Sequence, residues 1–492
     1  MWGALEPSRE ALPRGHRPAL LIILIACFAL RLGVGWVLPS IQHADEVYQV
    51  AEQANRADHG YGIVPWEFRM ASRAVVLPTL VRPIYLINAS AETHQFLVAA
   101  LFCALSLIPV WVAFHWAARL YGLSGGVLAA TMMGTWFELV YFAQKPTADA
   151  VCSYFLLAAI FLARPAARAG AVFVAGCCLM LALGIRVQIA PAVGLALLLA
   201  FLIGGRSRRM ALVAGVAAGL AVVGVIEWAW WGVPFRGQWG YLAMEFTYGA
   251  SRFFAHEPVT FFAKEYVLMY GGALPVMAFL IYIGAKKAPV LLLTAIALIA
   301  PFHLIGHKEY RFVVAAVPVW VLLVSLGAAE LMARIERTAT LKTRSIIVGG
   351  WLVAMVCLSF GDHFRPMWTQ SRNNVLAFRE VGTQPDACGV GLVSIRWSQT
   401  PGYSGLGRDI PIYEVAPGQT ADFAAAANYL LLAPKAAIPP DPYVRWKEYA
   451  RPTQYLYRRP GECVPDPAAQ IIRPPGVPGL PESAGEPVPR VK

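Results

Sequence analysis

Residues 18–38 read PALLIILIACFALRLGVGWVL, an apolar run that holds a single charged residue, Arg31. An α-helix needs about 20 consecutive, mostly apolar residues to cross the hydrocarbon core of a bilayer. Basic residues precede the run, as in a signal peptide, but the run continues past Cys27 to full spanning length. We therefore expect a retained membrane-spanning helix here.

Similar runs recur along most of the chain. Of its 492 residues, 58% are hydrophobic and 14% are charged, whereas about a quarter of the residues in a soluble domain are charged. Further apolar runs lie at residues 96–117, 123–143, 149–163, 170–184, 188–204, 210–231, 267–284, 288–305, 312–333 and 345–361. With the first run they predict a polytopic α-helical membrane protein with about eleven transmembrane helices, within a transmembrane domain over 18–361.

The basic residues predict how these helices are oriented. The net charge is +12, but the basic residues form short clusters between the apolar runs, unlike the continuous basic face of a nucleic-acid-binding protein. If residues 1–17 are cytoplasmic, every cluster falls on the cytoplasmic side, as the positive-inside rule requires. The clusters hold Arg119; Arg164 and Arg168; Arg206, Arg208 and Arg209; Lys286 and Lys287; and Arg334, Arg337, Lys342 and Arg344. The long loops 39–95 and 232–266 then face away from the cytoplasm.

The first long loop opens on an acidic motif, HADE at residues 43–46. Two carboxylates beside an imidazole at a membrane surface are costly unless they are solvated, paired or used in function. Asp45, Gln49, Glu52 and Arg56 recur at helical spacing, so we expect a short helix that begins near the motif. We interpret Glu52 and Arg56 as its solvated face, and Asp45 as a functional candidate.

Two further groups of residues accompany the acidic motif. Trp66-Glu67-Phe68 and Ser72-Arg73 follow in the same loop, and His307-Lys308-Glu309-Tyr310-Arg311-Phe312 lies far downstream. Together these stretches resemble the dolichol-phosphate-mannose-dependent mannosyltransferases, glycosyltransferase family 22 of the GT-C class, and the resemblance spans residues 20–330. That family carries His-x-Asp-Glu, Trp-Glu and Arg-Ser patterns early and His-Lys-Glu-x-Arg-Phe late. This chain departs from it in the order Ser72-Arg73 and in Tyr310, which replaces a common second acidic residue.

The resemblance implies an inverting glycosyltransferase that moves mannose from a polyprenyl-phosphate donor to a lipid-linked glycan or glycolipid acceptor on the non-cytoplasmic face. Such a transfer needs a base that takes the proton of the acceptor hydroxyl, and positive charge that stabilises the departing phosphate. Asp45 is the expected base, with Glu46 orienting the acceptor or Asp45. The expected donor-phosphate ligands are His307, Lys308, Arg311 and Arg186, and the expected acceptor or sugar contacts are His43, Trp66, Glu67 and Arg73.

Some of these charged residues have simpler explanations. Lys308 and Arg311 could extend toward lipid head groups, and Arg73 could pair with Glu67 instead of binding phosphate. His307 and Arg311 are four residues apart, so they would share one face if their turn is helical.

Other charged residues lie within or beside the apolar runs. Arg31 should face the bundle interior, where we expect structural pairing with Glu227 or Asp149 rather than catalysis. Lys145 and Asp149 are four residues apart and are candidates for a local ion pair at a helix start.

The composition changes near residue 361, where the apolar runs shorten and Pro and Gly become frequent. The sequence predicts strands at residues 389–395 and 429–432, each between turns. We therefore expect residues 362–471 to form a small extracytoplasmic α+β domain. Cys388 and Cys463 are its only cysteines, and they are candidates for a disulfide if this side is oxidising. Residues 472–492 are Pro-rich and are expected to be disordered.

Two alternatives remain open at this stage. A GT-C enzyme could transfer another sugar, such as an arabinosyl or aminoarabinosyl group, and a lipid-linked sugar flippase or transporter would share the hydropathy. Transporters place polar sites near the midplane of repeated halves, whereas these charges crowd one face and no internal repeat is visible. We expect no metal, because no His/Cys cluster has metal-ligand spacing, and no nucleic-acid partner, because the basic residues form short clusters between apolar runs. We also expect no cofactor. The compact loops favour a bacterial inner membrane with a periplasmic site over an endoplasmic-reticulum membrane with a lumenal one.

Overall fold

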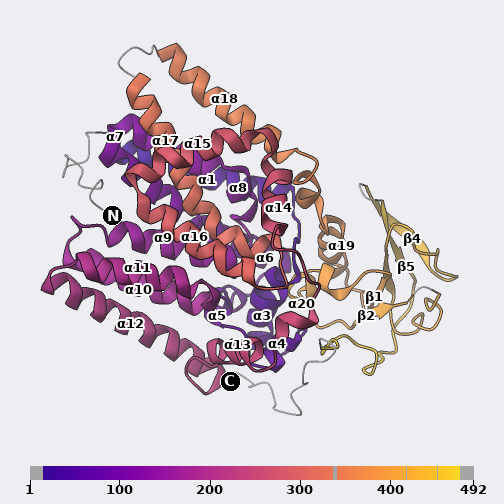
Figure 1. Ribbon diagram of the computed structural model, residues 1–492. Coiled ribbons are helices and arrows are strands. Elements are labelled where there is room, and N and C mark those ends of the chain that lie inside the picture. The colour runs from indigo at the N-terminus through magenta and orange to yellow at the C-terminus, as the bar shows by residue number, and fades with distance from the viewer. Residues whose placement is uncertain (1–14, 336–340, 417, 451–452, 477–492) are drawn as a thin grey trace. The chain divides into compact units, whose positions relative to one another are not determined.

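The computed structural model describes residues 15–335, 341–416, 418–450 and 453–476 (Figure 1). Most of the predicted cytoplasmic segment 1–17 and of the predicted disordered tail 472–492 lies outside these ranges, as does Arg337 of the last basic cluster. The chain forms two compact units, which we describe separately. The helical unit comprises Met1–Val34 and Ala100–Arg365, and the sheet unit comprises Gly35–Ala99 and Pro366–Lys492.

Every apolar run predicted from the sequence is helical. Within the described residues, five stretches are long and apolar enough to cross a membrane, and five shorter helices are also apolar. The long ones are His16–Val37 (α1), Ala91–Thr135 (α6, Ala91–Leu105, and α7, Leu107–Thr135), Arg206–Trp231 (α12), Phe261–Lys287 (α14, Phe261–Tyr270, and α15, Leu274–Lys287) and Tyr310–Ile335 (ending in α17, Val317–Ile335). The shorter ones are Ala148–Leu162 (α9), Ala169–Ile185 (α10), Val187–Ile203 (with α11, Ala190–Ile203), Pro289–Leu304 (α16) and Ser345–Ser359 (in α18, Leu341–Ser359). The helical unit also contains two short helices, α8 (Phe137–Phe142) and α13 (Arg236–Phe246).

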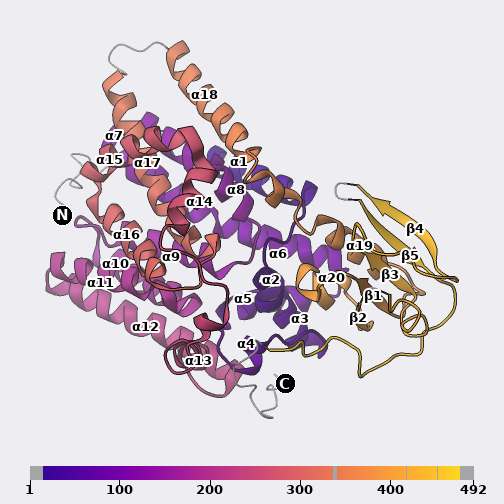
Figure 2. The ribbon, with the colours of Figure 1, turned by 45° about the vertical axis from the view of Figure 1, so that its right-hand side comes forward.

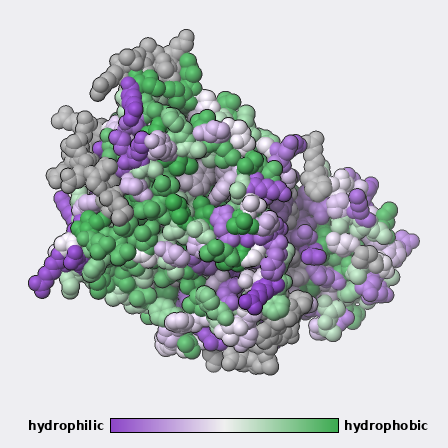
Figure 3. Space-filling view, in the orientation of Figure 1, coloured by the Kyte–Doolittle hydropathy of each residue, from purple (hydrophilic) through white to green (hydrophobic). Residues whose placement is uncertain are grey.

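Helix α17 lies at the centre of the helical unit, since most of its side chains are buried. It packs against α7 and α15, while α10 packs against α9 and α12. A Cβ at Gly327 of α17 would lie 2.1 Å from the carbonyl oxygen of Leu280 in α15, so a glycine here allows the two helices to approach closely. Helices α10, α11 and α12 lie side by side in Figures 1 and 2, and Figure 3 shows a largely hydrophobic surface over this region, as expected for helices that face lipid.

The sheet unit begins with the first long loop, which is mostly helical. It contains α2 (Ala44–Glu46), a π-helical turn (Val47–Ala51), α3 (Glu52–His59), α4 (Trp66–Arg69) and α5 (Val76–Tyr85). The helical spacing of residues 45 to 56 therefore predicted this segment correctly. Helices α19 (Arg372–Gly382) and α20 (Gly402–Leu406) follow from the C-terminal part of the chain.

A mixed five-stranded sheet, ordered β2-β1-β3-β5-β4, forms the C-terminal region. β1 (Val390–Val393) lies between β2 (Ile412–Val415) and β3 (Tyr429–Leu432), parallel to both. β5 (Gln454–Arg458) pairs antiparallel with β3 and with β4 (Val444–Tyr449). The two strands predicted from the sequence are thus confirmed as β1 and β3, and a disulfide joins Cys388, just before β1, to Cys463.

The first loop and the C-terminal region share one hydrophobic core. Ile41, Tyr48 and Ile63 of the loop are buried in the same cluster as Phe378 and Leu392. This shared core explains why the loop belongs to one compact unit with residues that follow it by more than 300 positions.

The chain remains attached to the first loop beyond the boundary predicted at residue 472. The carbonyl oxygen of Ile472 accepts a hydrogen bond from the Val64 amide at 2.8 Å, and that of Pro474 accepts one from Arg69 at 2.7 Å.

Candidate functional site

The predicted site residues fall into two clusters, one in each unit. His43, Asp45, Glu46, Trp66, Glu67 and Arg73 belong to the sheet unit, whereas Arg186, His307, Lys308 and Arg311 belong to the helical unit. We describe each cluster within its own unit.

The acidic motif forms the N-terminus of α2. His43 is the N-cap residue, and its Nδ1 atom accepts a hydrogen bond from the Asp45 amide at 3.3 Å. The Glu46 side chain turns back and accepts from the amides of Gln42 and His43 at 3.0 and 3.2 Å. These bonds form a capping box, which satisfies amides that the helix itself leaves unpaired. Glu46 is therefore buried and engaged with backbone, while Asp45 remains the carboxylate whose side chain is 16% exposed.

Asp45 and Glu67 share one cation. Nη2 of Arg73 lies 3.8 Å from Oδ2 of Asp45 and 3.6 Å from Oε1 of Glu67. These separations are those of ion pairs rather than direct hydrogen bonds. Gln49, one turn after Asp45, donates to the same Glu67 oxygen at 3.3 Å. The predicted pairing of Arg73 with Glu67 is thus confirmed, with Asp45 as a second partner.

A tight turn after α4 brings Arg73 back to Glu67. The carbonyl oxygen of Glu67 accepts hydrogen bonds from the amide and the hydroxyl of Ser72 at 2.8 and 3.1 Å. Burial raises the pKa of the Glu67 carboxyl, Arg73 opposes that rise and the nearby Asp45 adds to it. Trp66, at the start of α4, is half-buried.

Glu52 is not solvated, contrary to the sequence interpretation. Its side chain is fully buried and accepts hydrogen bonds from the amides of Ile63, Tyr403 and Ser404 at 2.8 to 3.1 Å. Gly402 has a φ of +61°, and a Cβ there would lie 2.7 Å from a Glu52 oxygen. Glycine is therefore required at this position both for its conformation and for the close approach.

Arg56 is not on a solvated face either. It is half-buried and donates to Oε1 of Gln53 at 3.0 Å, and burial lowers its pKa to about 10. Helical spacing identified the helix correctly but not its exposed side, because residues of α20 cover Glu52.

The downstream motif forms an ion cluster in the helical unit. Glu309 lies between His307 and Arg311: Nε2 of His307 is 2.9 Å from Oε1, and Nε of Arg311 donates to Oε2. A 3₁₀ helix begins only at Tyr310, so the condition for a shared helical face of His307 and Arg311 is not met. They meet through the carboxylate instead. The hydrogen bond with Glu309 raises the pKa of His307, while burial opposes this rise.

Lys308 points inward. Its side chain is buried, and Nζ donates to the carbonyl oxygens of Glu257 and Ile305 at 2.9 and 2.5 Å. The alternative that it extends toward lipid head groups is therefore wrong. Two of its three N–H donors are already used by the backbone.

Arg186 lies beside the same motif. Its Nη2 atom is 2.7 Å from Oδ1 of Asp149, and both side chains are buried. The guanidinium groups of Arg186 and Arg311 lie 5.8 and 5.2 Å from the ring centre of Phe312. The fold thus brings Arg186 and the downstream motif together around one aromatic ring.

Comparison with known proteins identifies the family. A model of the Alg9-like mannosyltransferase family matches residues 22–378, most of the chain. The chain belongs to the Alg9-like mannosyltransferase family. It is a mannosyltransferase and an integral multi-pass membrane protein.

Individual relatives agree with this assignment. This mannosyltransferase is 23% identical over 406 residues to a protein of Yarrowia lipolytica named GPI mannosyltransferase 3, covering 80% of this chain and 76% of the relative. Its fold is similar to crystal structures of ArnT from Cupriavidus metallidurans in the undecaprenyl-phosphate-bound and apo states. The TM-scores are 0.54 and 0.56 at 13% and 12% identity, over 90% and 89% of this chain and 97% of ArnT in both cases. At this identity the match shows that the chain has the ArnT-like GT-C fold.

Sequence analysis missed a buried carboxyl group of this mannosyltransferase, Glu138 in α8. Its two oxygens accept hydrogen bonds from the hydroxyls of Tyr270 and Tyr310, and from Nε1 of Trp136 at 2.9 Å. The available signal was a single acidic residue inside the apolar run 123–143, since ionisable residues within a membrane segment normally have a partner or a function.

Arg31 also has partners other than those predicted. It faces the interior and donates to the Ser106 carbonyl and hydroxyl oxygens at 2.6 and 2.8 Å, and to the carbonyl oxygens of Met133 and Gly134 at 3.0 and 3.2 Å. Glu227 instead accepts from the Gly237 amide at 2.8 Å. Arg31 therefore joins helices of the mannosyltransferase by donating to backbone carbonyl oxygens. Its role is structural, as predicted, but its partners are not Glu227 or Asp149. Over the described ranges, no group of three or more His, Cys, Asp or Glu side chains could hold a metal ion.

Proposed function

We propose that this protein is an inverting mannosyltransferase that takes mannose from a polyprenyl-phosphate donor. The acceptor is the hydroxyl group of a lipid-linked glycan or glycolipid on the non-cytoplasmic face. The support comes from the family match, from the relative named a GPI mannosyltransferase, and from the ArnT structure determined with undecaprenyl phosphate.

Asp45 is the proposed general base. The acceptor oxygen attacks the anomeric carbon, the bond from that carbon to the phosphate oxygen breaks, and its electron pair leaves with the phosphate. The proton of the acceptor hydroxyl passes to the Asp45 carboxylate. The observation that carries this assignment is the different environment of the two carboxyl groups of α2. Glu46 accepts hydrogen bonds from two backbone amides, whereas Asp45 is partly exposed and is stabilised by Arg73.

The cluster of the helical unit is suited to the phosphate. Lys308, Arg311 and Arg186 are three cations, and Glu309 and Asp149 are two anions, so the cluster keeps one excess positive charge. Protonation of His307 adds a second. This excess, held in place by hydrogen bonds, is suited to stabilise the negative charge that grows on the leaving phosphate. His43, Trp66, Glu67 and Arg73, which lie in the same long loop as Asp45, are the proposed acceptor or sugar contacts.

Donor use is the direct test of the proposal. Purified full-length protein should transfer mannose from polyprenyl-phosphate mannose to a membrane lipid extract and should give no product with GDP-mannose. Product formation from the nucleotide sugar alone would contradict the proposal. Equal transfer of another sugar from polyprenyl phosphate would contradict mannose specificity while leaving the lipid-phosphate donor intact.

The orientation has its own test. Asn88 and Ser207 are exposed and lie in regions that the basic residues predict to be on opposite sides of the membrane. In a variant whose exposed Cys357 is replaced by serine, Asn88→Cys and Ser207→Cys should react with an impermeant thiol reagent from opposite faces. Labelling of both from the same face would overturn the topology. In bacterial cells the proposed membrane is the inner membrane, with the site facing the periplasm; in a eukaryotic cell it is that of the endoplasmic reticulum, with a lumenal site.

A further inference from the structure

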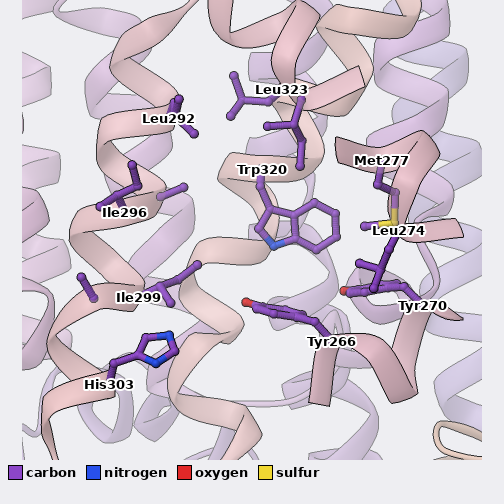
Figure 4. A pocket seen from close by; sticks show the side chains of 13 residues that line it. Tyr266, Tyr270, Leu274, Met277, Leu292, Ile296, Ile299, His303, Trp320 and Leu323 are labelled. Carbon is purple, nitrogen blue, oxygen red and sulfur yellow. The ribbon is translucent and has the colours of Figure 1, made fainter. Parts of the chain in front are cut away.

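The helical unit contains an apolar pocket and, elsewhere, a concentration of positive charge. The pocket, among α14, α15, α16 and α17, has a volume of about 400 Å³ and is lined mostly by Leu, Ile, Ala and Met side chains (Figure 4). Such walls offer little with which to select one apolar chain over another. The charge comes from Arg119 of α7, Arg164 just after α9 and Arg208 of α12, which we call the arginine cluster.

The arginine cluster is built around the end of α9. The ring of Phe161 is buried in the last turn of this helix, and the Cζ atoms of Arg119 and Arg164 lie 5.2 and 4.5 Å from its centre. These are cation–π distances. Nη2 of Arg208 donates to the carbonyl oxygens of Ala163 and Arg164 at 2.9 and 2.8 Å. Three positive charges are therefore held around one helical turn.

The charge of the arginine cluster is not balanced by the protein. Among the described residues, none of the three arginines forms an ion pair with a carboxylate. The stretches 117–126, 163–170 and 203–210, which contain the cluster, hold arginines but no lysine, aspartate or glutamate. Burial, followed by the positive charges of the other two arginines, lowers the pKa of Arg164 to about 10. Like charges this close repel one another, and an anion between them relieves the repulsion.

Arg119 and Arg164 retain hydrogen-bond donors for such an anion. Nη1 of Arg119 donates to the carbonyl oxygen of His115 at 2.9 Å, and Nη1 of Arg164 donates to that of Phe161 at 3.0 Å. A guanidinium group has five N–H donors, and both residues are partly exposed. The planar fork of a guanidinium group matches two oxygens of a phosphate group.

The arginine cluster lies where apolar helices end. The backbone of α7 leaves the helical conformation at Gly122, just after Arg119, with a φ of +77°. Arg164 lies just beyond the end of α9 at Leu162, and Arg208 is in the first turn of α12. The ends of membrane-spanning helices lie at the level of the lipid head groups, where phosphate is the common anion. The positive-inside rule accounts for arginines on this side, but not for their packing around one ring.

We propose that the arginine cluster binds the phosphate group of an anionic phospholipid, in the leaflet where these helix ends lie. In the predicted orientation this is the cytoplasmic leaflet. Arg119 and Arg164 donate to the phosphate oxygens, while Arg208 adds positive charge and holds the turn after α9. A zwitterionic lipid carries a cation beside its phosphate, which the three guanidinium groups repel, so the site selects an anionic head group. The inference does not depend on the proposed function, because none of these residues belongs to the proposed transfer site.

Native mass spectrometry of the purified, delipidated full-length protein tests the selectivity. Phosphatidylglycerol and phosphatidylcholine with the same acyl chains are titrated separately. The first phosphatidylglycerol should bind about tenfold more tightly than the first phosphatidylcholine, because only the latter brings an added cation to the site. Equal affinities would overturn the proposal. This comparison uses the unaltered protein, so it does not depend on how variants fold.

Variants then locate the site. Arg119→Gln and Arg164→Gln should each weaken phosphatidylglycerol binding about tenfold, because each removes a charge-assisted hydrogen bond to phosphate. Arg206→Gln, at an exposed arginine at the start of α12, removes the same charge and is the matched control. It should weaken binding less than about twofold, because an exposed charge is screened by salt. An equal loss in the control would overturn the proposal in favour of general charge attraction.

Inorganic phosphate distinguishes a lipid head group from a soluble anion. At the same concentration as phosphatidylglycerol it should leave the bound lipid in place, because the lipid also contacts the protein through its acyl chains. Displacement of the lipid under these conditions would overturn the proposal in favour of a soluble phosphate compound.

Discussion

The hydroxyl group of Tyr310 donates a hydrogen bond to the carboxyl group of Glu138, a residue 172 positions earlier in the chain. Tyr270 donates to the other oxygen, so this carboxyl joins α8, α14 and the 3₁₀ helix that carries Arg311. Tyr310 is where the sequence departs from the family pattern, which commonly has an acidic residue there. In this chain the tyrosine hydroxyl contacts the carboxyl group of Glu138, which comes from a distant helix.

Tyr310→Phe should destabilise the helical unit, because it keeps the ring but removes one of the donors to a fully buried carboxyl. The expected loss is about 1–3 kcal/mol in the free energy of unfolding, measured by thermal unfolding in detergent. Tyr282→Phe, at an exposed tyrosine, is the matched control and should have no effect. Unfolding of Tyr310→Phe at the temperature of the unaltered protein would show that the Glu138 bond contributes nothing.

Asp45→Asn should lower turnover by at least about a hundredfold, since a positioned general base contributes about 10²–10⁴ in rate. The amide keeps the shape of the side chain but cannot take the proton, so donor binding should change little. Glu46→Gln retains an oxygen for the Gln42 and His43 amides and should cost much less. Near-normal turnover of Asp45→Asn with loss in Glu46→Gln would make Glu46 the base, and activity in both would make the motif structural.

Donor affinity should depend on pH through His307. Its pKa is raised, first by the hydrogen bond with Glu309, so the folded state holds this proton more tightly than the unfolded chain, whose value is about 6.5. The raised pKa of His307 therefore adds to the stability of the folded protein. This contribution is fully present below a pH of about 6.5 and is lost as the pH rises through the pKa that His307 has in the folded protein. The same proton adds positive charge for phosphate, so binding of polyprenyl phosphate should weaken over this upper range.

Glu309→Gln should move the midpoint of that pH dependence down toward about 6.5, because it removes the main cause of the raised pKa. The midpoint is the quantity to compare, since the variant also adds net positive charge and can bind phosphate more tightly overall. Binding titrations at several pH values measure it. A His307→Gln control should abolish the dependence; if the dependence persists in that control, another group is responsible.

Glu52→Gln should destabilise the sheet unit by about 2–4 kcal/mol, because a carboxylate that accepts three buried amides is replaced by a group with a single acceptor oxygen. Glu448→Gln, at an exposed glutamate of β4, should cost less than about 1 kcal/mol. Limited proteolysis of the C-terminal region reports the difference. Equal resistance of both variants would show that Glu52 is not needed to hold α3 against α20.

The sequence alone determined the apolar helices, two of the five strands and the family. An apolar run of spanning length must be helical in a bilayer, because only then are its backbone groups satisfied without partners from elsewhere. The family motifs are likewise contiguous in the chain, so residues 43–46 and 307–312 are recognisable without a fold.

Only the tertiary structure decided the partners of the charged side chains. Glu52 appeared solvated because α20, which covers it, lies some 350 residues away. Arg31 was matched to carboxylates but binds backbone carbonyls, which every residue carries and no side-chain pattern reveals. Glu138 and Tyr310 each stand out in their own segments, but they become a pair only when α8 meets the downstream motif. A buried polar group takes whichever partner the packing of distant segments brings within hydrogen-bond distance, and that packing is a property of the whole chain.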